Sequence, residues 1–149
     1  MPEATTPATY NDQNIFAKIL RGELPCIKVY EDEHTLAFMD IMPQAEGHVL
    51  VLPKEGAAEL FDLSDEAASA AIRTTRKLAR AVRAAFTPPG IAIFQLNGSA
   101  AGQTVPHVHF HVLPRYSDTP LQPHARVQAD NDKLKAHAEK IIAALQADQ

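Results

Sequence analysis

The sequence holds a single cysteine, Cys26, so no disulfide can form within the chain and a reducing compartment is expected. It lacks any apolar run long enough to cross a bilayer. Its polar N-terminal stretch also lacks the basic and apolar segments of a signal peptide. No repeat, Cys-x-x-Cys or His-Glu-x-x-His motif is present. These absences predict a cytoplasmic protein that has no membrane partner.

An excess of charge of one sign is also missing. The 14 basic residues against 18 acidic ones give a formal net charge of −4, so no nucleic-acid partner is expected. A hydrophobic content of 46% with 21% charged residues is typical of a globular protein. The length of 149 residues is that of one domain, and we predict a disordered tail over residues 1–12 and a single domain over residues 13–149.

The apolar pattern predicts an α+β fold with a mainly antiparallel sheet of five strands. The expected strands are residues 27–32, 35–40, 47–54, 91–96 and 107–114. A short helix is expected over residues 15–22, a long helix between the N-cap Ser64 and the Pro-Pro-Gly at 88–90, and a C-terminal helix from about Asn131. A proline-rich loop is expected over residues 114–123.

The most informative segment is GQTVPHVHFHVLPR, which carries three histidines at alternate positions, His107, His109 and His111. Alternate residues of a strand face the same side, so the three imidazoles share one face, while the apolar residues between them pack on the other. A neutral imidazole attacks phosphorus near pH 7, and a neighbouring histidine can protonate the leaving group. The pattern therefore indicates nucleophilic catalysis on a phosphate.

A metal site is the alternative for the same histidines. The outer two lie about 13 Å apart along a strand, too far to share one zinc ion, so a third ligand would come from elsewhere. His48 and Asp40 are the candidates. At this point the metal interpretation stays open.

The segment before the histidines, NGSAAGQT at residues 97–104, supports a phosphate substrate. It lies in a connection of about ten residues, longer than an ordinary hairpin loop. Small, glycine-containing loops of this kind expose backbone N–H groups to anions. Ser99, Gln103 and Thr104 add side-chain donors.

These residues resemble a known signature. The stretch AGQTVPHVHFHVLPR resembles the His-φ-His-φ-His-φ-φ signature of the histidine triad (HIT) superfamily, where φ is apolar. The stretch from Ile15 to Lys54 is similar to the N-terminal half of its Hint-like branch. The resemblance implies a HIT-like fold that pairs into a homodimer with a continuous sheet. It also implies reaction at the α-phosphate of a purine nucleotide through a nucleotidyl-histidine intermediate, with no cofactor.

The resemblance also implies the substrate class. Nucleoside phosphoramidates are expected, and dinucleoside polyphosphates are the alternative because AGQTV is also similar to the Fhit-like branch. A non-catalytic nucleotide-binding regulatory protein is the third possibility. Three intact histidines favour the enzyme over the binding protein.

Residue roles follow from the matched positions. The resemblance implies that His109 is the nucleophile, that His111 contacts the phosphate and assists the leaving group, and that His107 and His48 support them. It places Asp40 at the ribose hydroxyls. The implied phosphate loop comprises Asn97, Gly102, Gln103 and Thr104, and the implied base site comprises Ile15, Phe16, Ile19, Phe38 and Ile41. The phenylalanines and isoleucines suit a plain core equally well, and Asp40 suits a turn cap.

The sequence departs from its relatives at one further site. Many bacterial relatives hold a structural zinc ion through a Cys-x-x-Cys near the start and a histidine after Pro-Lys. Here those positions read Asn14-Ile15-Phe16-Ala17 and Lys54-Glu55-Gly56. No structural zinc is therefore expected. His34, His124 and His137 match no motif and are expected at the surface.

Overall fold

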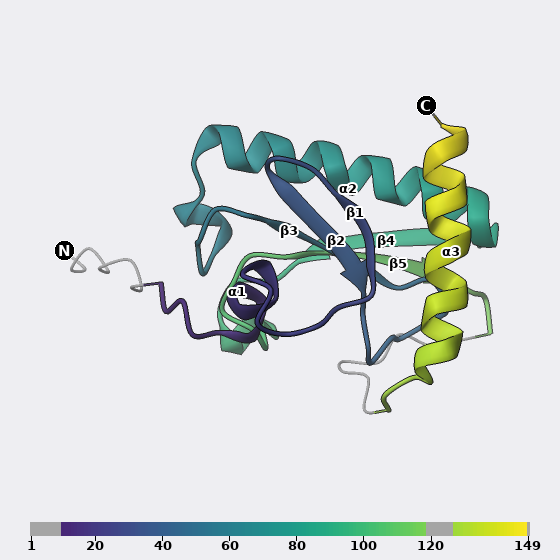
Figure 1. Ribbon diagram of the computed structural model, residues 1–149, viewed down its shortest axis with the longest axis horizontal. Helices are drawn as coiled ribbons and strands as arrows, with labels where there is room; N and C mark the ends of the chain where they lie inside the picture. Colours follow the sequence, from purple (N-terminus) through teal and green to yellow (C-terminus); the bar gives the residue numbers. More distant parts are fainter. Residues whose placement is uncertain (1–9, 119–126, 149) are drawn as a thin grey trace.

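A computed structural model describes residues 10–118 and 127–148 (Figure 1). Its sheet has five strands, all antiparallel, in the spatial order β1-β2-β3-β5-β4. The strands are β1 (Lys28–Glu31), β2 (Thr35–Met39), β3 (Val49–Pro53), β4 (Gly90–Gln95) and β5 (Phe110–Arg115). The predicted α+β class and five-stranded antiparallel sheet are confirmed.

Within the described residues, three α-helices accompany the sheet: α1 (Ile15–Leu20), α2 (Asp65–Phe86) and α3 (Asn131–Ala147). Two short 3-10 turns, η1 (Leu60–Asp62) and η2 (Ser99–Ala101), lie in the connections. The Ser64 side chain accepts a hydrogen bond from the Ala67 N–H at 3.1 Å, as expected for the N-cap of the long helix. After Phe86 the chain turns through Thr87, whose φ of 46° is left-handed, into two prolines that cannot continue the helix.

The helices divide between the two faces of the sheet (Figure 1). The long helix α2 and the C-terminal helix α3 pack on one face, in a core that includes Leu78, Val82 and Ile141. The short helix α1 covers the other face, where Phe16 meets Phe38 and Leu52. Strand β3 is buried at every position because both of its faces are covered, as its near-continuous apolar run predicts.

The strand of histidines begins later than expected. We predicted it from residue 107, but β5 begins at Phe110, which pairs with Val51 of β3 and Gln95 of β4. Upstream of it, the Val108 N–H bonds to the Ala57 carbonyl oxygen instead of to a neighbouring strand. The alternation nevertheless continues through this segment. Its apolar side chains enter the core beneath α2, and its histidines lie on the α1 face of the sheet.

Three other expectations change. Tyr10, placed in the disordered tail, contacts His107, whereas residues 1–9 lie outside the described residues. Of the expected loop 114–123, residues 114 and 115 belong to β5, and residues 119–126 lie outside the described part, as does His124. His137 is not at the surface: it is 9% exposed and packs edge-on against Phe86.

In the described ranges, no helix combines the length and apolar content of a membrane span.

Candidate active site

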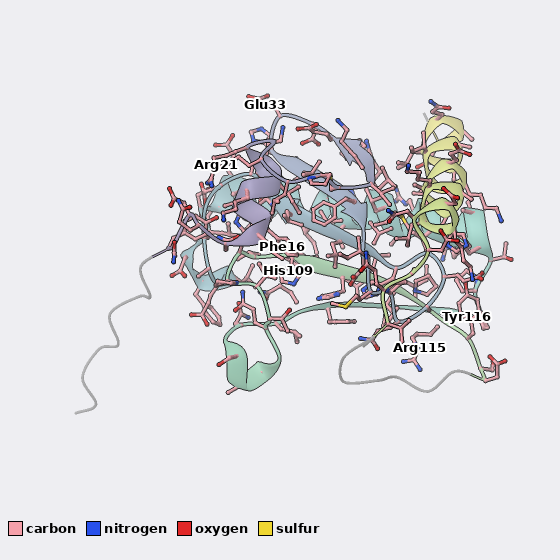
Figure 2. The ribbon with its side chains drawn as sticks, turned by 60° about the horizontal axis from the view of Figure 1, so that its bottom comes forward. Phe16, Arg21, Glu33, His109, Arg115 and Tyr116 are labelled. Carbon is pink, nitrogen blue, oxygen red and sulfur yellow. The ribbon has the colours of Figure 1, made fainter. Side chains whose placement is uncertain are left out.

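The centre of the site is a bond between two of the three histidines. His109 is 5% exposed, and its Nδ1 lies 2.7 Å from the carbonyl oxygen of His107. A carbonyl only accepts, so Nδ1 carries the hydrogen and the lone pair of the neutral ring sits on Nε2. Phe16 of α1 packs edge-on against this ring, with centroids 4.9 Å apart, and Figure 2 shows the two side chains together beneath α1. The backbone thus fixes which nitrogen can act as a nucleophile.

His107 is fixed by contacts at both nitrogens. Its ring is fully buried, and Nε2 lies 2.8 Å from the carbonyl oxygen of Pro53, the last residue of β3. Nε2 therefore donates, and Nδ1 accepts from the hydroxyl of Tyr10 at 2.6 Å. The predicted supporting role of His107 has a geometric basis, since its carbonyl holds His109 while its ring is held from two sides.

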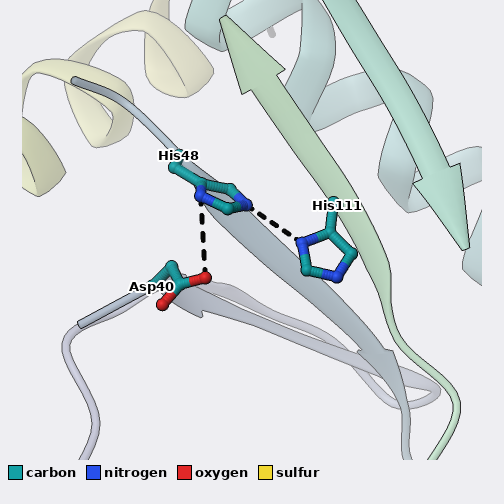
Figure 3. A group of neighbouring side chains, drawn as sticks. All are labelled: Asp40, His48 and His111. Atoms are coloured by element: carbon teal, nitrogen blue, oxygen red, sulfur yellow. Dashed lines mark hydrogen bonds and ion pairs between the residues drawn. The ribbon is translucent and has the colours of Figure 1, made fainter. Parts of the chain in front are cut away.

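His111 and His48 form the second half of the site (Figure 3). The Gln44 N–H donates to His48 Nδ1 at 3.2 Å, so the hydrogen of neutral His48 is on Nε2. That Nε2 lies 3.0 Å from His111 Nδ1, and it therefore donates to it. The hydrogen of His111 must then sit on its own Nε2. Phe94, opposite His111 in the β4–β5 pairing, stacks on this ring, with the two ring centroids 4.3 Å apart.

The electrostatics keep all four rings neutral. Burial lowers the pKa of His107 and of His109 below the usual value of 6.5. Burial, and then the nearby His109, lower the pKa of His48 to about 4. Burial and the two neighbouring histidines lower the pKa of His111 to about 3. At neutral pH the site therefore presents one basic nitrogen, on His109, beside one N–H donor, on His111, whose ring centroids are 5.0 Å apart.

Asp40 lies next to His48, and burial raises the pKa of its carboxyl to about 6. One of its oxygens accepts from the Met42 N–H at 2.9 Å, and the other lies 3.6 Å from His48 Nδ1. The structure thus brings together Asp40, His48 and His111, the residues considered for a metal. They form a chain, because His48 turns opposite nitrogens to its two neighbours (Figure 3). A zinc ion needs ligand atoms that converge at about 2.0–2.2 Å, and the nitrogen that His48 turns to Asp40 is not the one it turns to His111, so one ion cannot use both contacts.

The expected phosphate loop is held by its own side chains. The Gly98 N–H donates to Gln103 Oε1 at 2.7 Å, and Gln103 Nε2 donates to the carbonyl oxygens of Ala58 and Val105. Both amide hydrogens of Gln103 are therefore engaged, and the expectation that this side chain donates to phosphate is revised: it shapes the loop. Asn97 likewise accepts from the Leu60 N–H at 2.8 Å. Thr104 remains exposed, and Gly102 adopts a φ of 102°, which favours glycine.

The residues expected around the base divide into two groups. Phe16 and Phe38 are 6% and 4% exposed and belong to the core beneath α1, so the plain core interpretation holds for both. Ile15 and Ile41 are 51% and 48% exposed, and Ile19 is half-buried against the same core. Of these five residues, the three isoleucines therefore keep apolar surface that a ligand can contact.

Sequence reasoning missed two residues that contact the triad. Phe94 stacks on His111, and the alternation of side chains along its strand could have indicated the face of the sheet on which it lies. Tyr10 donates to His107 from a polar segment in which no periodic pattern marks it.

Known proteins resemble the chain along most of its length. The profile of the HIT domain matches residues 21–118. A Bacillus subtilis protein named hit is 46% identical over 102 residues, which are 68% of this chain and 70% of that protein. The adenosine 5'-monophosphoramidase hnt1 of Schizosaccharomyces pombe is 43% identical over 101 residues, 68% of this chain and 73% of the yeast protein. A crystal structure of a Bartonella henselae Hit-like protein involved in cell-cycle regulation superposes with a TM-score of 0.86 at 43% identity, covering 91% of this chain and 98% of the other.

Proposed function

The chain belongs to the HIT family, and from this premise we propose that it hydrolyses phosphoramidates of purine nucleotides at the α-phosphate. The observation that carries the proposal is the bond from His109 Nδ1 to the His107 carbonyl, which leaves the Nε2 lone pair for phosphorus. A similar yeast protein bears the name adenosine 5'-monophosphoramidase, and this supports the choice of substrate.

The reaction follows from the tautomers of the rings. His109 Nε2 attacks the α-phosphorus, the new N–P bond forms, and the P–N bond to the leaving amine breaks. The amine takes the hydrogen of His111 Nε2, while His48 stays hydrogen-bonded to His111 Nδ1 along their 3.0 Å contact. Water then attacks the nucleotidyl-histidine and gives one proton back to His111 Nε2, so the nucleotide is released and His109 and His111 return to their starting forms. The N–H groups of Gly98, Ala101, Gly102 and Gln103 bond within the loop, so the exposed Thr104 supplies the hydroxyl donor for charge on the phosphate oxygens.

Substrate turnover tests this proposal. Purified protein is incubated with adenosine 5'-phosphoramidate and, separately, with a diadenosine polyphosphate, and release of AMP is measured. We expect a kcat/KM at least tenfold higher for the phosphoramidate. The reverse order would assign the chain to polyphosphate cleavage, and nucleotide binding without turnover of either would make it a binding protein.

A homodimer is part of the proposal. Strand β4 is at the edge of the sheet, and its Ile93 is 47% exposed next to Ile72 of α2, which is 52% exposed. Together with arginines of α2, these isoleucines line one groove. An exposed edge strand offers unpaired backbone groups, and a second β4 satisfies both them and the apolar side chains. Pairing of β4 with β4 would continue the sheet from one protomer into the next.

A further inference from the structure

The hydroxyl of Tyr10 lies 2.6 Å from His107 Nδ1, in a segment that precedes α1. The two rings meet edge to face, with centroids 5.6 Å apart. Tyr10 also lies against Gly56: a Cβ at residue 56 would come within 2.6 Å of the tyrosine ring. This glycine leaves room for the ring where any side chain would displace it.

Neighbouring groups fix the direction of the hydrogen bond. The Pro53 carbonyl takes the Nε2 hydrogen of His107, so neutral His107 has only an acceptor at Nδ1, and Tyr10 donates to it. Asn14 Nδ2 donates to the tyrosine oxygen at 3.1 Å. The Asn14 side chain also caps α1 by accepting from the Ala17 N–H. The hydroxyl thus connects the start of α1 to the first histidine of the triad.

From this geometry we propose that Tyr10 is a positioning residue for the nucleophile. Tyr10 holds the His107 ring against Pro53, and the His107 carbonyl in turn holds Nδ1 of His109 at 2.7 Å. Asn14, anchored to the same hydroxyl, sets the start of α1, whose Phe16 packs on the other side of the His109 ring. Both contacts that orient the nucleophile therefore depend on one hydroxyl group. The inference rests on the proposed function only for its catalytic consequence.

Tyr10→Phe removes the hydroxyl and keeps the ring. Because the variant loses one neutral hydrogen bond, we expect kcat to fall about five- to tenfold with KM changed less than twofold. The acid limb of the kcat profile should move to higher pH, because loss of the donor at Nδ1 makes protonation of His107 easier. Tyr30→Phe is the matched control: its hydroxyl bonds to Asp32, away from the histidines, and kcat should stay at the wild-type value.

Gly56→Ala tests the same link from the other side. The added methyl group displaces the Tyr10 ring, so this variant should reproduce the loss seen with Tyr10→Phe. The double variant should be no worse than the more impaired single variant, because both changes break one contact. Additive losses would show that the two residues act separately and would overturn the proposal.

A readout without substrate separates this proposal from the proposed function. Imidazole ¹⁵N resonances should show one His107 tautomer, with hydrogen on Nε2, in the wild type and a mixture or a protonated ring in Tyr10→Phe. An inactive wild type that still shows this change would sink the proposed hydrolysis and leave Tyr10 as the residue that sets His107. Unchanged resonances, kcat and acid limb in Tyr10→Phe would overturn the role of Tyr10.

Discussion

His48 Nε2 lies 3.0 Å from His111 Nδ1, and through this hydrogen bond the tautomer of His48 determines the tautomer of His111. The series begins at the backbone, because the Gln44 N–H occupies His48 Nδ1. The hydrogen of His48 is therefore on Nε2, which donates to His111 Nδ1, and the hydrogen of His111 is in turn on its Nε2. On the other side of the site, the Pro53 and His107 carbonyls set His107 and His109 in the same way. Backbone N–H and C=O groups therefore largely determine which ring nitrogen of each histidine carries the hydrogen.

Stability should fall on acidification because His48 is buried neutral. Its pKa is lowered from 6.5 to about 4, so as pH falls the unfolded chain takes up a proton at this residue before the folded protein does. The contribution of neutral His48 to the free energy of unfolding is fully present above pH 6.5. It is lost as pH falls to about 4, a loss of about 3 kcal/mol. Urea unfolding between pH 7.5 and 4 should show a shallower dependence in His48→Asn than in the wild type.

In the same experiment, Asp40 changes the pH dependence of the free energy of unfolding in the opposite direction. Burial raises its pKa to about 6, so the folded protein takes up this proton first, and its contribution grows as pH falls from about 6 to 3.8. Asp40→Asn should therefore make the acid loss steeper. Identical slopes in the wild type and both variants would contradict the direction of both shifts.

Asp40→Asn should also change sugar specificity. If Asp40 accepts hydrogen bonds from the 2′- and 3′-hydroxyls, each is worth roughly 1.5–3 kcal/mol because the acceptor is charged. We expect ribonucleotide binding to weaken at least tenfold while 2′,3′-dideoxy analogues bind nearly as before, measured by calorimetry above pH 7. Equal losses for both sugars would remove Asp40 from the ribose site. A loss confined to kcat would instead assign it to His48, 3.6 Å away.

Metal removal should have no effect. The positions where relatives carry the two cysteine ligands hold Asn14 and Ala17, and here Asn14 caps α1 while Ala17 is buried. Metal analysis of purified protein should find well under one zinc per chain, and chelator should leave Tm and activity unchanged. Stoichiometric zinc would revive the metal interpretation, and loss of that zinc in His48→Asn would locate it at Asp40, His48 and His111.

The fold was largely predictable from sequence because its signals are local. The Ser64 cap and the prolines at 88 and 89 bound α2, and the apolar run of residues 49–52 matches a strand covered on both faces. The start of β5 was not predictable in this way, since it depends on where β4 ends and on the Val108–Ala57 bond. Strand pairing is a long-range property that periodicity does not contain.

The site was predictable where residues repeat in register and not where distant groups meet. Alternation placed the three histidines on one face, and the bond from His109 Nδ1 to the His107 carbonyl joins two of them. Tyr10 is 97 residues from His107 in sequence, and its segment has no pattern. The polar side chain of Gln103 indicated a ligand donor, but three backbone groups of the protein satisfy it instead.

Ile93→Lys should dissociate the proposed dimer. A charge placed on the exposed edge strand opposes β4–β4 pairing, both by repulsion from its twofold copy and by desolvation. Wild-type protein should sediment as a dimer, and the variant as a monomer at micromolar concentration. Phe61→Lys is the control, because Phe61 is 79% exposed outside the β4 groove. A monomeric wild type, or dissociation by both variants, would contradict the proposed interface.

His109→Asn should abolish turnover and keep nucleotide binding. Asparagine preserves a donor toward the His107 carbonyl but has no basic nitrogen for phosphorus, so kcat should fall by several orders of magnitude, as for other lost nucleophiles. His34→Asn, a histidine whose side chain is 41% exposed, should leave kcat unchanged. Rapid quench of the wild type with labelled phosphoramidate should trap one nucleotidyl group per active site, stable in base and labile in acid. If hydrolysis proceeds with no adduct on His109, or if His109→Asn turns over normally, water attacks phosphorus directly and the tautomers of the triad serve binding alone.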